Sequence, residues 1–256
     1  MKQTIYTYNV NGIRAAIRKG LKEWFKSVNP DVLMIQETKA QPEDIDTFFF
    51  KELGYHVFVH SAEKKGYSGV MTICRQEPDA VIAGIGNERF DAEGRFLRTD
   101  FGDITLINSY FPSGTTGTVR QDVKYAYLDA VQAYINELKK HRPNIILSGD
   151  FNICHKPIDI SKPEKKKNVS GFLPEERQWV SNFLNNGFVD SFRAYDQRPD
   201  QYSWWSYRAN ARSKNLGWRI DYHMVSESLA GNMKNANIHA DVYHSDHCPV
   251  SLEMEI

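Results

Sequence analysis

Two side chains that could activate water and hold a charged oxygen follow a short apolar run in the middle of the chain. The run spans residues 144–147, and Gly149 precedes Asp150 and Asn152. An apolar run of this length predicts a buried strand. Because side chains alternate along an extended backbone, Asp150 and Asn152 are expected on the same side. Each needs a polar partner and is poor core material, so the pair predicts a reactive site.

Apolar runs that carry polar side chains at one end or within them recur along the chain. Further examples lie at residues 5–12, 32–38, 104–110, 219–223 and 245–252. Together they carry Asn9, Asn11, Glu37, Tyr110, Asp221, Asp246 and His247. A sheet that gathers such residues from distant segments predicts a catalytic cleft.

The acids and amides at these strand ends indicate a metal site. Taken alone, Glu37 is equally well explained as one partner of a salt bridge at the end of a strand. The metal interpretation is favoured because similar donors lie at other strand ends, namely Asn9, Asn11, Asp150, Asp221 and Asp246. All of these ligands are oxygens, which suits Mg²⁺ or Mn²⁺ rather than Zn²⁺.

A histidine near the C-terminus has an acid that could orient it. Pro249 favours an extended approach to His247, and Asp221 offers a carboxylate from another strand. The imidazolium form would stabilise charge that develops on a phosphate, whereas the neutral form would take a proton from water. Asp150 is the competing candidate for the base. Tyr110 could donate to a phosphate oxygen.

The order of predicted elements favours an α/β fold in which helices cover β-sheets. Helices are expected at about 18–28, 42–53, 122–141 and 174–186. Between the second and third helices, strand-like runs follow one another at 55–60, 68–74, 80–85, 95–101 and 104–110. Without a repeat or a linker, residues 1–256 are expected to form one catalytic domain, with a monomer as the default.

Composition narrows the classes of partner. The net charge of +0 argues against a generic nucleic-acid binder. Between residues 201 and 220, however, Arg208, Arg212, Lys214 and Arg219 alternate with aromatic rings and no acid is present, which favours DNA contact. No apolar run reaches about 18 residues, so neither a signal peptide nor a membrane span is predicted. Three scattered cysteines favour reduced core thiols and a cytoplasmic location.

These motifs, in this order, resemble one known family. The chain is similar to the exonuclease III class of apurinic/apyrimidinic endonucleases, within the deoxyribonuclease I-like endonuclease/exonuclease/phosphatase superfamily. The resemblance covers essentially the whole chain. Its motifs lie at residues 8–14, 36–39, 66–70, 149–152, 215–222 and 245–249.

The resemblance implies a four-layer α/β/β/α sandwich and a Mg²⁺-dependent cut 5′ to an abasic site in duplex DNA, which leaves a 3′-hydroxyl. Exonuclease and 3′-phosphodiesterase activities often accompany that cut, so blocked 3′ ends are further expected substrates. A cytoplasmic location, associated with the nucleoid in a bacterium, is expected.

The resemblance also implies roles for single residues. Glu37 binds the metal with Asn11 beside it and Asp246 nearby. Asn9 orients Asp150, and Asp221 lies behind His247. Contacts to the scissile phosphate are assigned to Asn152, His247 and Tyr110. The expected DNA-binding residues are Arg14 in a basic cluster, Asn168, the pocket aromatics Trp204 and Trp218, and Arg208, which stands where some relatives carry an apolar wedge.

Two rival functions fit parts of the pattern. A phosphoesterase of the same superfamily could act on a nucleotide, a phosphoinositide or a lipid headgroup, but the Trp- and Arg-rich segment favours DNA. A DNA-binding relative without catalysis would gain nothing from buried carboxylates that repel phosphate. No phosphate-binding Walker loop, dinucleotide fingerprint or zinc-protease motif occurs in the sequence.

Overall fold

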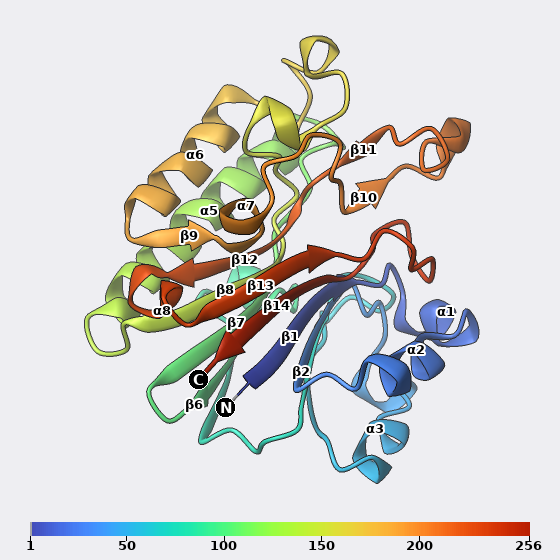
Figure 1. The fold of residues 1–256 in the computed structure, drawn as a ribbon, viewed down its shortest axis with the longest axis vertical. Helices are drawn as coiled ribbons and strands as arrows, with labels where there is room; N and C mark the ends of the chain where they lie inside the picture. The colour runs from blue at the N-terminus through green and yellow to red at the C-terminus, as the bar shows by residue number, and fades with distance from the viewer. Residues whose placement is uncertain (1) are drawn as a thin grey trace.

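The protein is a four-layer sandwich of two six-stranded sheets with helices on both outer faces (Figure 1). The structure, a computed structural model, describes residues 2–256. It therefore confirms the predicted mixed α/β architecture. Among these residues no helix is long and apolar enough to cross a bilayer.

The first sheet has the strand order β13-β14-β1-β2-β4-β3, and the second has the order β5-β6-β7-β8-β12-β9. The strands of the first sheet, in that order, are Met233–Ile238, Val250–Glu255, Lys2–Asn9, Val32–Gln36, Val70–Cys74 and His56–His60. Those of the second are Ala80–Ala83, Phe96–Phe101, Ile104–Tyr110, Asn144–Asp150, Asp221–Ser226 and Phe188–Asp190. A separate hairpin pairs β10 (Trp204–Trp205) with β11 (Gly217–Trp218).

The helices lie outside the two sheets and between their strands in sequence. The α-helices are α1 (Ile13–Arg18), α2 (Leu21–Val28), α3 (Phe48–Glu52), α4 (Glu88–Asp91), α5 (Thr118–Lys139), α6 (Pro174–Asn185), α7 (Ser191–Tyr195) and α8 (Glu227–Ala230). Short 3₁₀ turns are η1 (Pro42–Asp44), η2 (Pro157–Asp159), η3 (Pro163–Lys165) and η4 (Arg208–Asn210).

Two of the four predicted helices are shorter than the sequence pattern indicated. The segment predicted at 18–28 is the helix α2, which begins only after Gly20, because that residue has a left-handed backbone; the preceding helix α1 was not predicted. The segment predicted at 42–53 is a 3₁₀ turn followed by the short helix α3. The long helix α5 and the Pro-initiated helix α6 agree with the sequence pattern within a few residues.

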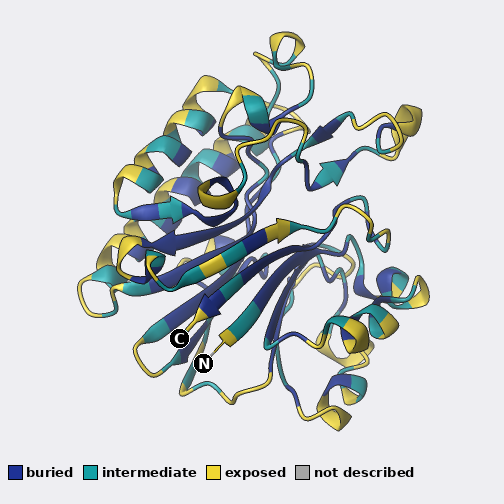
Figure 2. Cartoon of the chain, viewed as in Figure 1, coloured by how far each residue is buried: buried dark blue, intermediate teal, exposed yellow. Residues whose placement is uncertain are grey.

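The central strands are buried on both faces, as Figure 2 shows by their dark colour. In β1, Ile5 points into the space between the sheets, whereas Tyr6 and Tyr8 pack under α1 and α2. In β8, Ile146 lies between the sheets and Leu147 packs under α5 and α6. This alternation fixes the register, since a shift by one residue would exchange the two cores.

The sheets each have a parallel pair at the centre, β1 with β2 and β7 with β8. Close approach of β7 and β8 requires Gly149, because a Cβ there would lie 1.8 Å from the carbonyl oxygen of Ser109. The last residues of all four strands therefore reach the same end of the sandwich (Figure 1).

Polar side chains cross-link the sheets within the otherwise apolar core. Gln36 Nε2 donates to Asn108 Oδ1 at 2.7 Å, and both side chains are buried. His223 Nε2 lies 3.0 Å from the Val250 carbonyl oxygen and Nδ1 lies 2.7 Å from the Ser148 hydroxyl. Donation to a carbonyl requires a proton on Nε2, so the neutral ring accepts from Ser148 at Nδ1. Burial lowers the pKa of His223 to about 4.

This buried histidine predicts a loss of stability in mild acid. The unfolded chain binds a proton at His223 near pH 6.5, whereas the folded protein resists protonation down to about pH 4. The free energy of unfolding should therefore fall by roughly 3 kcal/mol more in wild type than in a His223→Gln variant over that window. Urea unfolding at several pH values measures the slope. An exposed-residue control is His141→Gln, and equal slopes for wild type and His223→Gln would contradict the assignment.

Candidate active site

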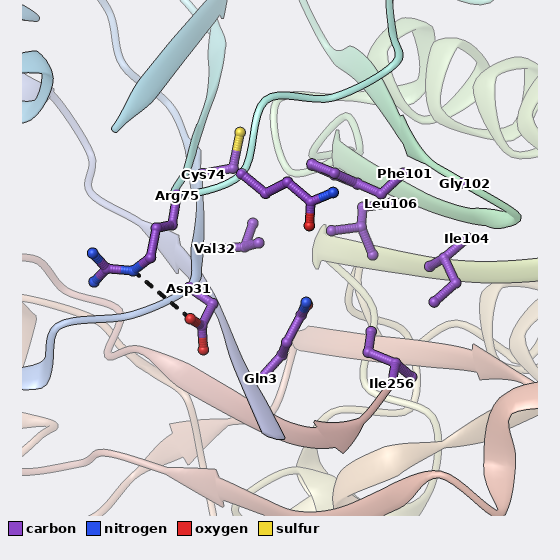
Figure 3. A pocket seen from close by; sticks show the side chains of 11 residues that line it. Gln3, Asp31, Val32, Cys74, Arg75, Phe101, Gly102, Ile104, Leu106 and Ile256 are labelled. Atoms are coloured by element: carbon purple, nitrogen blue, oxygen red, sulfur yellow. Dashed lines mark ion pairs between the residues drawn. The ribbon is translucent and has the colours of Figure 1, made fainter. Parts of the chain in front are cut away.

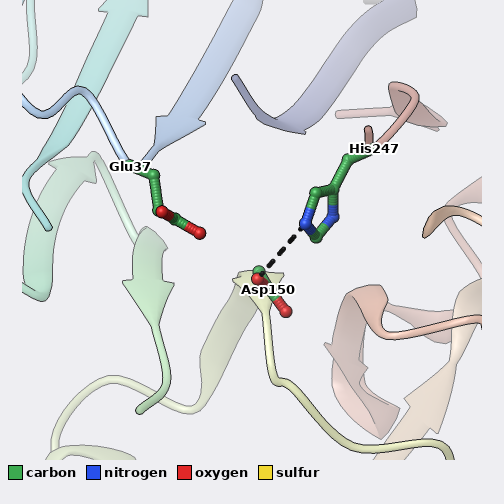
Figure 4. A group of neighbouring side chains, drawn as sticks. All are labelled: Glu37, Asp150 and His247. Atoms are coloured by element: carbon green, nitrogen blue, oxygen red, sulfur yellow. Dashed lines mark ion pairs between the residues drawn. The ribbon is translucent and has the colours of Figure 1, made fainter. Parts of the chain in front are cut away.

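The sequence motifs meet where the central strands end. Oxygen and nitrogen atoms of Glu37, Asp150 and His247 all lie within 4.8 Å of one another, and Figure 4 shows the three side chains converging from separate segments. Glu37 follows β2 of one sheet, and Asp150 ends β8 of the other. The structure therefore brings together residues from three distant parts of the sequence.

The strands end in sharp turns rather than in continued extended backbone. Asn11, Glu37, Lys39 and Asn152 all have left-handed backbones, with φ between 47° and 52°. Asparagine adopts this conformation readily, but for Glu37 and Lys39 it is unfavourable and persists only where the surroundings hold it, which is common at functional sites. The prediction that Asp150 and Asn152 share one side through extended geometry was wrong in its reason, because β8 ends at Asp150.

Asp150 and Asn152 are nevertheless in contact, because the turn that follows β8 brings them together. The Asn152 backbone N–H donates to Asp150 Oδ1 at 2.8 Å, and its amide Nδ2 lies 3.2 Å from Asp150 Oδ2. Nδ2 also donates to the Phe111 carbonyl oxygen at 2.9 Å, which sets the orientation of the amide. Asp150 is therefore held by its neighbour on one side.

Asn9 joins the acids of the two sheets. Its amide Nδ2 donates to Glu37 Oε1 and to Asp150 Oδ2, each at 2.8 Å, and its Oδ1 accepts from the Asn11 backbone N–H at 3.0 Å. Asn9 is fully buried. A neutral donor between two carboxylates reduces their repulsion and fixes the distance between them.

His247 is positioned by Asp221 and Ser203. Its Nδ1 lies 2.9 Å from Asp221 Oδ2, which also accepts from the Ser203 hydroxyl at 2.6 Å. This leaves Nε2 facing Asp150, at 3.8 Å from Oδ2. Asp221 is the first residue of β12, which is antiparallel to β8, so this strand contributes its beginning rather than its end.

Burial and the neighbouring charges have opposite effects on the pKa of His247. Burial alone lowers the pKa of His247, but Asp221, Asp150 and Asp246 outweigh it and raise the pKa to about 10. The ring is therefore an imidazolium at neutral pH. Burial, together with Asp221 and Glu37, raises the pKa of Asp150 against the opposing effect of His247. A buried acid with a raised pKa beside a fixed cation is typical of proton transfer.

An oxygen-rich wall faces these groups and fits a hard cation. Glu37 Oε2 lies 2.7 Å and Asn11 Oδ1 lies 2.5 Å from the ammonium of Lys39, so this wall already attracts positive charge. Burial opposes ionisation of Glu37, but Lys39 and Asn9 outweigh it and lower its pKa. A protonated His247 has no lone pair for a metal, so the fit is to oxygen donors, as Mg²⁺ requires.

Asp246 links this wall to the aromatic rim. Its Oδ1 accepts from Asn11 Nδ2 at 2.9 Å, and its Oδ2 accepts from the indole N–H of Trp204 at 3.0 Å. Burial alone would raise the pKa of Asp246, but His247, Asn11 and Trp204 outweigh it and lower the pKa. Asp246 therefore orients Asn11 and Trp204, and Asn11 in turn contacts Lys39, the partner of Glu37.

Tyr110 ends β7 beside Asp150, with which it pairs across the sheet. The buried guanidinium of Arg95 lies 4.7 Å from the centre of its ring and donates to its carbonyl oxygen at 3.0 Å. Arg95 is in turn paired with Glu93 at 2.5 Å. Burial and the nearby Glu37 raise the pKa of Tyr110, so the phenol stays protonated and is a hydrogen-bond donor.

The predicted DNA-binding residues lie around this cluster at different depths. Trp204 and Trp218 meet edge to face at 5.9 Å, and a Cβ on Gly171 would lie 2.8 Å from the Trp218 ring. Arg14 lines a hollow of about 360 Å³ together with Lys39. Asn168 is exposed on a loop and Arg208 is exposed at the start of η4, and within residues 2–256 no hydrogen bond joins either to the clustered side chains.

Three contributors were not identified from the sequence. Lys39 lies two residues after Glu37, and a cation at that spacing was the available signal. Ser203 and Arg95 gave no such signal, because their contacts to Asp221 and Tyr110 join segments that only the fold brings together.

A separate hollow of about 610 Å³ lies at the opposite end of the sandwich, near the chain ends (Figure 3). Its lining includes Val32, Phe101, Ile104 and Leu106, and the charged residues Asp31 and Arg75 pair at 3.8 Å. These side chains offer no acid–base or metal chemistry comparable with that at the strand ends. The catalytic assignment therefore follows the chemistry of the side chains rather than the volume of the hollow.

Two packed sheets that deliver acids, amides and an imidazolium to one end define a phosphoesterase. The chain belongs to the endonuclease/exonuclease/phosphatase family, whose model matches residues 6–247. It is 43% identical to an exodeoxyribonuclease of Bacillus subtilis, over 98% of this chain and 99% of that protein. It is 38% identical to the DNA repair nuclease APEX1 of Danio rerio, over 98% of this chain and 82% of that protein.

Solved structures agree with this assignment. A 3′ phosphatase from Neisseria bound to a product DNA hairpin has a TM-score of 0.92 and 26% identity, and the match covers 99% of this chain and 100% of that one. An AP endonuclease from Archaeoglobus fulgidus has a TM-score of 0.89 and 30% identity, over 99% of this chain and 100% of that one. The family expected from the sequence motifs is therefore confirmed.

The oxygen-rich wall predicts a change in metal binding. Replacing Glu37 by Gln removes the charge of this wall while preserving its shape. The Glu37→Gln variant should bind Mn²⁺ at least about tenfold more weakly than wild type, as measured by the paramagnetic resonance of free Mn²⁺. The matched control is Glu43→Gln, on an exposed 3₁₀ turn. An unchanged binding curve for Glu37→Gln would remove this residue from the ligand set.

Proposed function

We propose that this protein is a DNA-repair nuclease that hydrolyses the phosphodiester on the 5′ side of an abasic site in duplex DNA, with Mg²⁺ as its cofactor. The observation that carries the proposal is the contact of Asp150 with Asn152, His247 and the Asn9–Glu37 pair. This set offers a base, a cation for phosphate and oxygen ligands for a metal. The DNA-directed names of the relatives support DNA as the substrate.

Asp150 is the proposed base. Its raised pKa favours proton acceptance from water near neutral pH, and Asn9 and Asn152 hold both of its oxygens in place. The water oxygen attacks phosphorus as its proton passes to Asp150, the bond to the 3′ oxygen of the upstream nucleotide breaks, and that oxygen takes up a proton from solvent water. This cleavage leaves a 3′-hydroxyl and a 5′-phosphate on the abasic sugar.

The phosphate oxygens face donors with little freedom to move. His247 presents a charged N–H at Nε2 because Asp221 holds Nδ1, and Tyr110 presents a protonated phenol. Fixed donors of this kind stabilise the charge that develops in the transition state. A divalent cation held by Glu37 and Asn11 would supply Lewis-acid neutralisation of that charge.

The aromatic rim supports abasic sugar as the recognised feature. Trp204 and Trp218 meet at right angles, and Gly171 lets the chain approach Trp218 closely. An abasic nucleotide has no base to unstack, so its extrusion costs less than that of a paired nucleotide. A narrow aromatic site next to Asp150 and His247 would admit the sugar and exclude a nucleotide with its base. The same catalytic side chains would also act on a 3′-terminal phosphate, which brings no base into the aromatic site.

The direct test is incision of a duplex that carries one abasic analogue, with Mg²⁺ and with chelator. Wild type should cut 5′ to the analogue only with the metal, and Asp150→Asn should lower single-turnover incision at least about a hundredfold while DNA affinity is mostly kept. Asp122→Asn, on the exposed side of α5, is the control. Preferred cleavage of a lipid or inositol phosphate would overturn the DNA assignment.

The pocket makes a separate prediction about selectivity. Trp218→Ala should lower kcat/KM on the abasic duplex at least about tenfold but change the affinity for unmodified duplex less than about twofold. Trp218→Phe keeps an aromatic wall and should recover part of the loss. Equal losses of abasic incision and of general duplex affinity would show that Trp218 serves DNA binding rather than recognition of the sugar.

A further inference from the structure

A second hollow, which the proposed mechanism does not use, adjoins the candidate active site. It has a volume of about 390 Å³ and lies between the connection of β10 to β11 and the segment that precedes His247. This falls in the range of about 300–1,000 Å³ that small-ligand sites occupy. Asp246 forms one wall and is itself bonded to Asn11 and Trp204, so the hollow shares a side chain with the site.

Two exposed tyrosines lie along this hollow. Tyr207 and Tyr243 each expose 66% of their surface, although both carry large apolar rings. Exposed aromatic side chains that gather at a hollow mark a binding surface more often than a solvated one. The ammonium of Lys19 lies 5.8 Å from the Tyr207 ring, which places a cation at the same edge.

One face of the Tyr243 ring packs against the side chain of Arg212. The guanidinium of Arg212 lies 4.1 Å from the centre of that ring and 4.6 Å from the Trp205 ring. Arg212 donates to the carbonyl oxygens of Ser245 at 3.1 Å, Ala240 at 3.0 Å and Val242 at 2.5 Å. One face of Tyr243 is therefore backed by a fixed cation, and the outer face is presented to solvent.

The side chains that line the hollow suit a nucleobase better than a phosphate group. Both terminal nitrogens of Arg212 are occupied by backbone carbonyl groups, and Asp246 adds a negative charge. A phosphate inside the hollow would meet that charge, whereas the Lys19 ammonium lies at its edge and is not part of the lining. An uncharged nucleobase would instead find an aromatic face backed by a cation, and Asn210 supplies an amide for its edge.

We infer that this hollow binds one unpaired nucleobase, stacked on the outer face of Tyr243, while the active site holds the DNA. The inference rests on the proposed function. A paired base has both faces covered within the duplex, so only an unpaired base is free to stack here. An abasic site creates one such base in the complementary strand, and a single-stranded end supplies another.

Fluorescence of 2-aminopurine, an adenine analogue, tests the inference and separates the two sources. One duplex carries the analogue opposite the abasic position, and a second carries it in a single-stranded overhang. Wild type, Tyr243→Leu and Tyr243→Phe are compared in chelator, which prevents cleavage. Tyr195→Leu is the control, because Tyr195 is 44% exposed on α7, outside the hollow.

Wild type, Tyr243→Phe and the control should quench the analogue in at least one duplex. With Tyr243→Leu the quenching should be lost and the affinity for that duplex should fall about tenfold, while affinity for a fully paired duplex stays the same. The duplex that responds identifies the source of the base. Equal fluorescence for wild type and Tyr243→Leu in both duplexes, or equal loss on the paired duplex, would overturn the inference.

Incision of the abasic duplex by wild type with Mg²⁺ is measured on the same preparation. Absence of incision would contradict the proposed function, and with it the base site. Normal incision together with unchanged fluorescence would contradict the base site alone.

Discussion

One buried amide group holds the centre of this molecule together. Asn9 Nδ2 donates to Glu37 and to Asp150, which come from different sheets, and without it two carboxylates would face each other in a region of low dielectric. The remaining contacts serve the same end, because Lys39 neutralises Glu37 from one side and His247 lies against Asp150 from the other. Charge balance therefore decides the arrangement of the site.

The two sheets hold the charged groups of the site in fixed positions. Their central strands are buried on both faces, so packing against helices and against the opposite sheet fixes the strand ends. The left-handed turns at Asn11, Glu37, Lys39 and Asn152 then direct polar side chains back toward one another. Conformational cost at these turns is offset by rigid strands that precede them. A site built on such elements is organised before substrate arrives.

The residues proposed to contact DNA are also held in place by the fold. Arg212 joins the hairpin connection to the segment that carries Asp246 and His247, through three carbonyl groups and the ring of Tyr243. A change in the position of this connection when DNA binds would therefore move the segment next to His247. Asp246 contacts both Trp204 and Asn11, so the residues proposed to recognise the lesion and those proposed to act on the phosphate share one framework.

The sequence alone determined the fold class, the family and most members of the candidate site, because each member lies at one end of an apolar run, as Asp150 and Glu37 do at the ends of their strands and Asp221 does at the beginning of β12. It could not determine that Glu37 and Asp150 meet through Asn9, that Ser203 holds Asp221, or that Arg95 lies beneath Tyr110. Nor could it place Asn152, for which alternation gave the right neighbour by the wrong geometry. Local patterns reveal which residues leave the core, but contacts between distant segments depend on strand order and register, which only tertiary packing fixes.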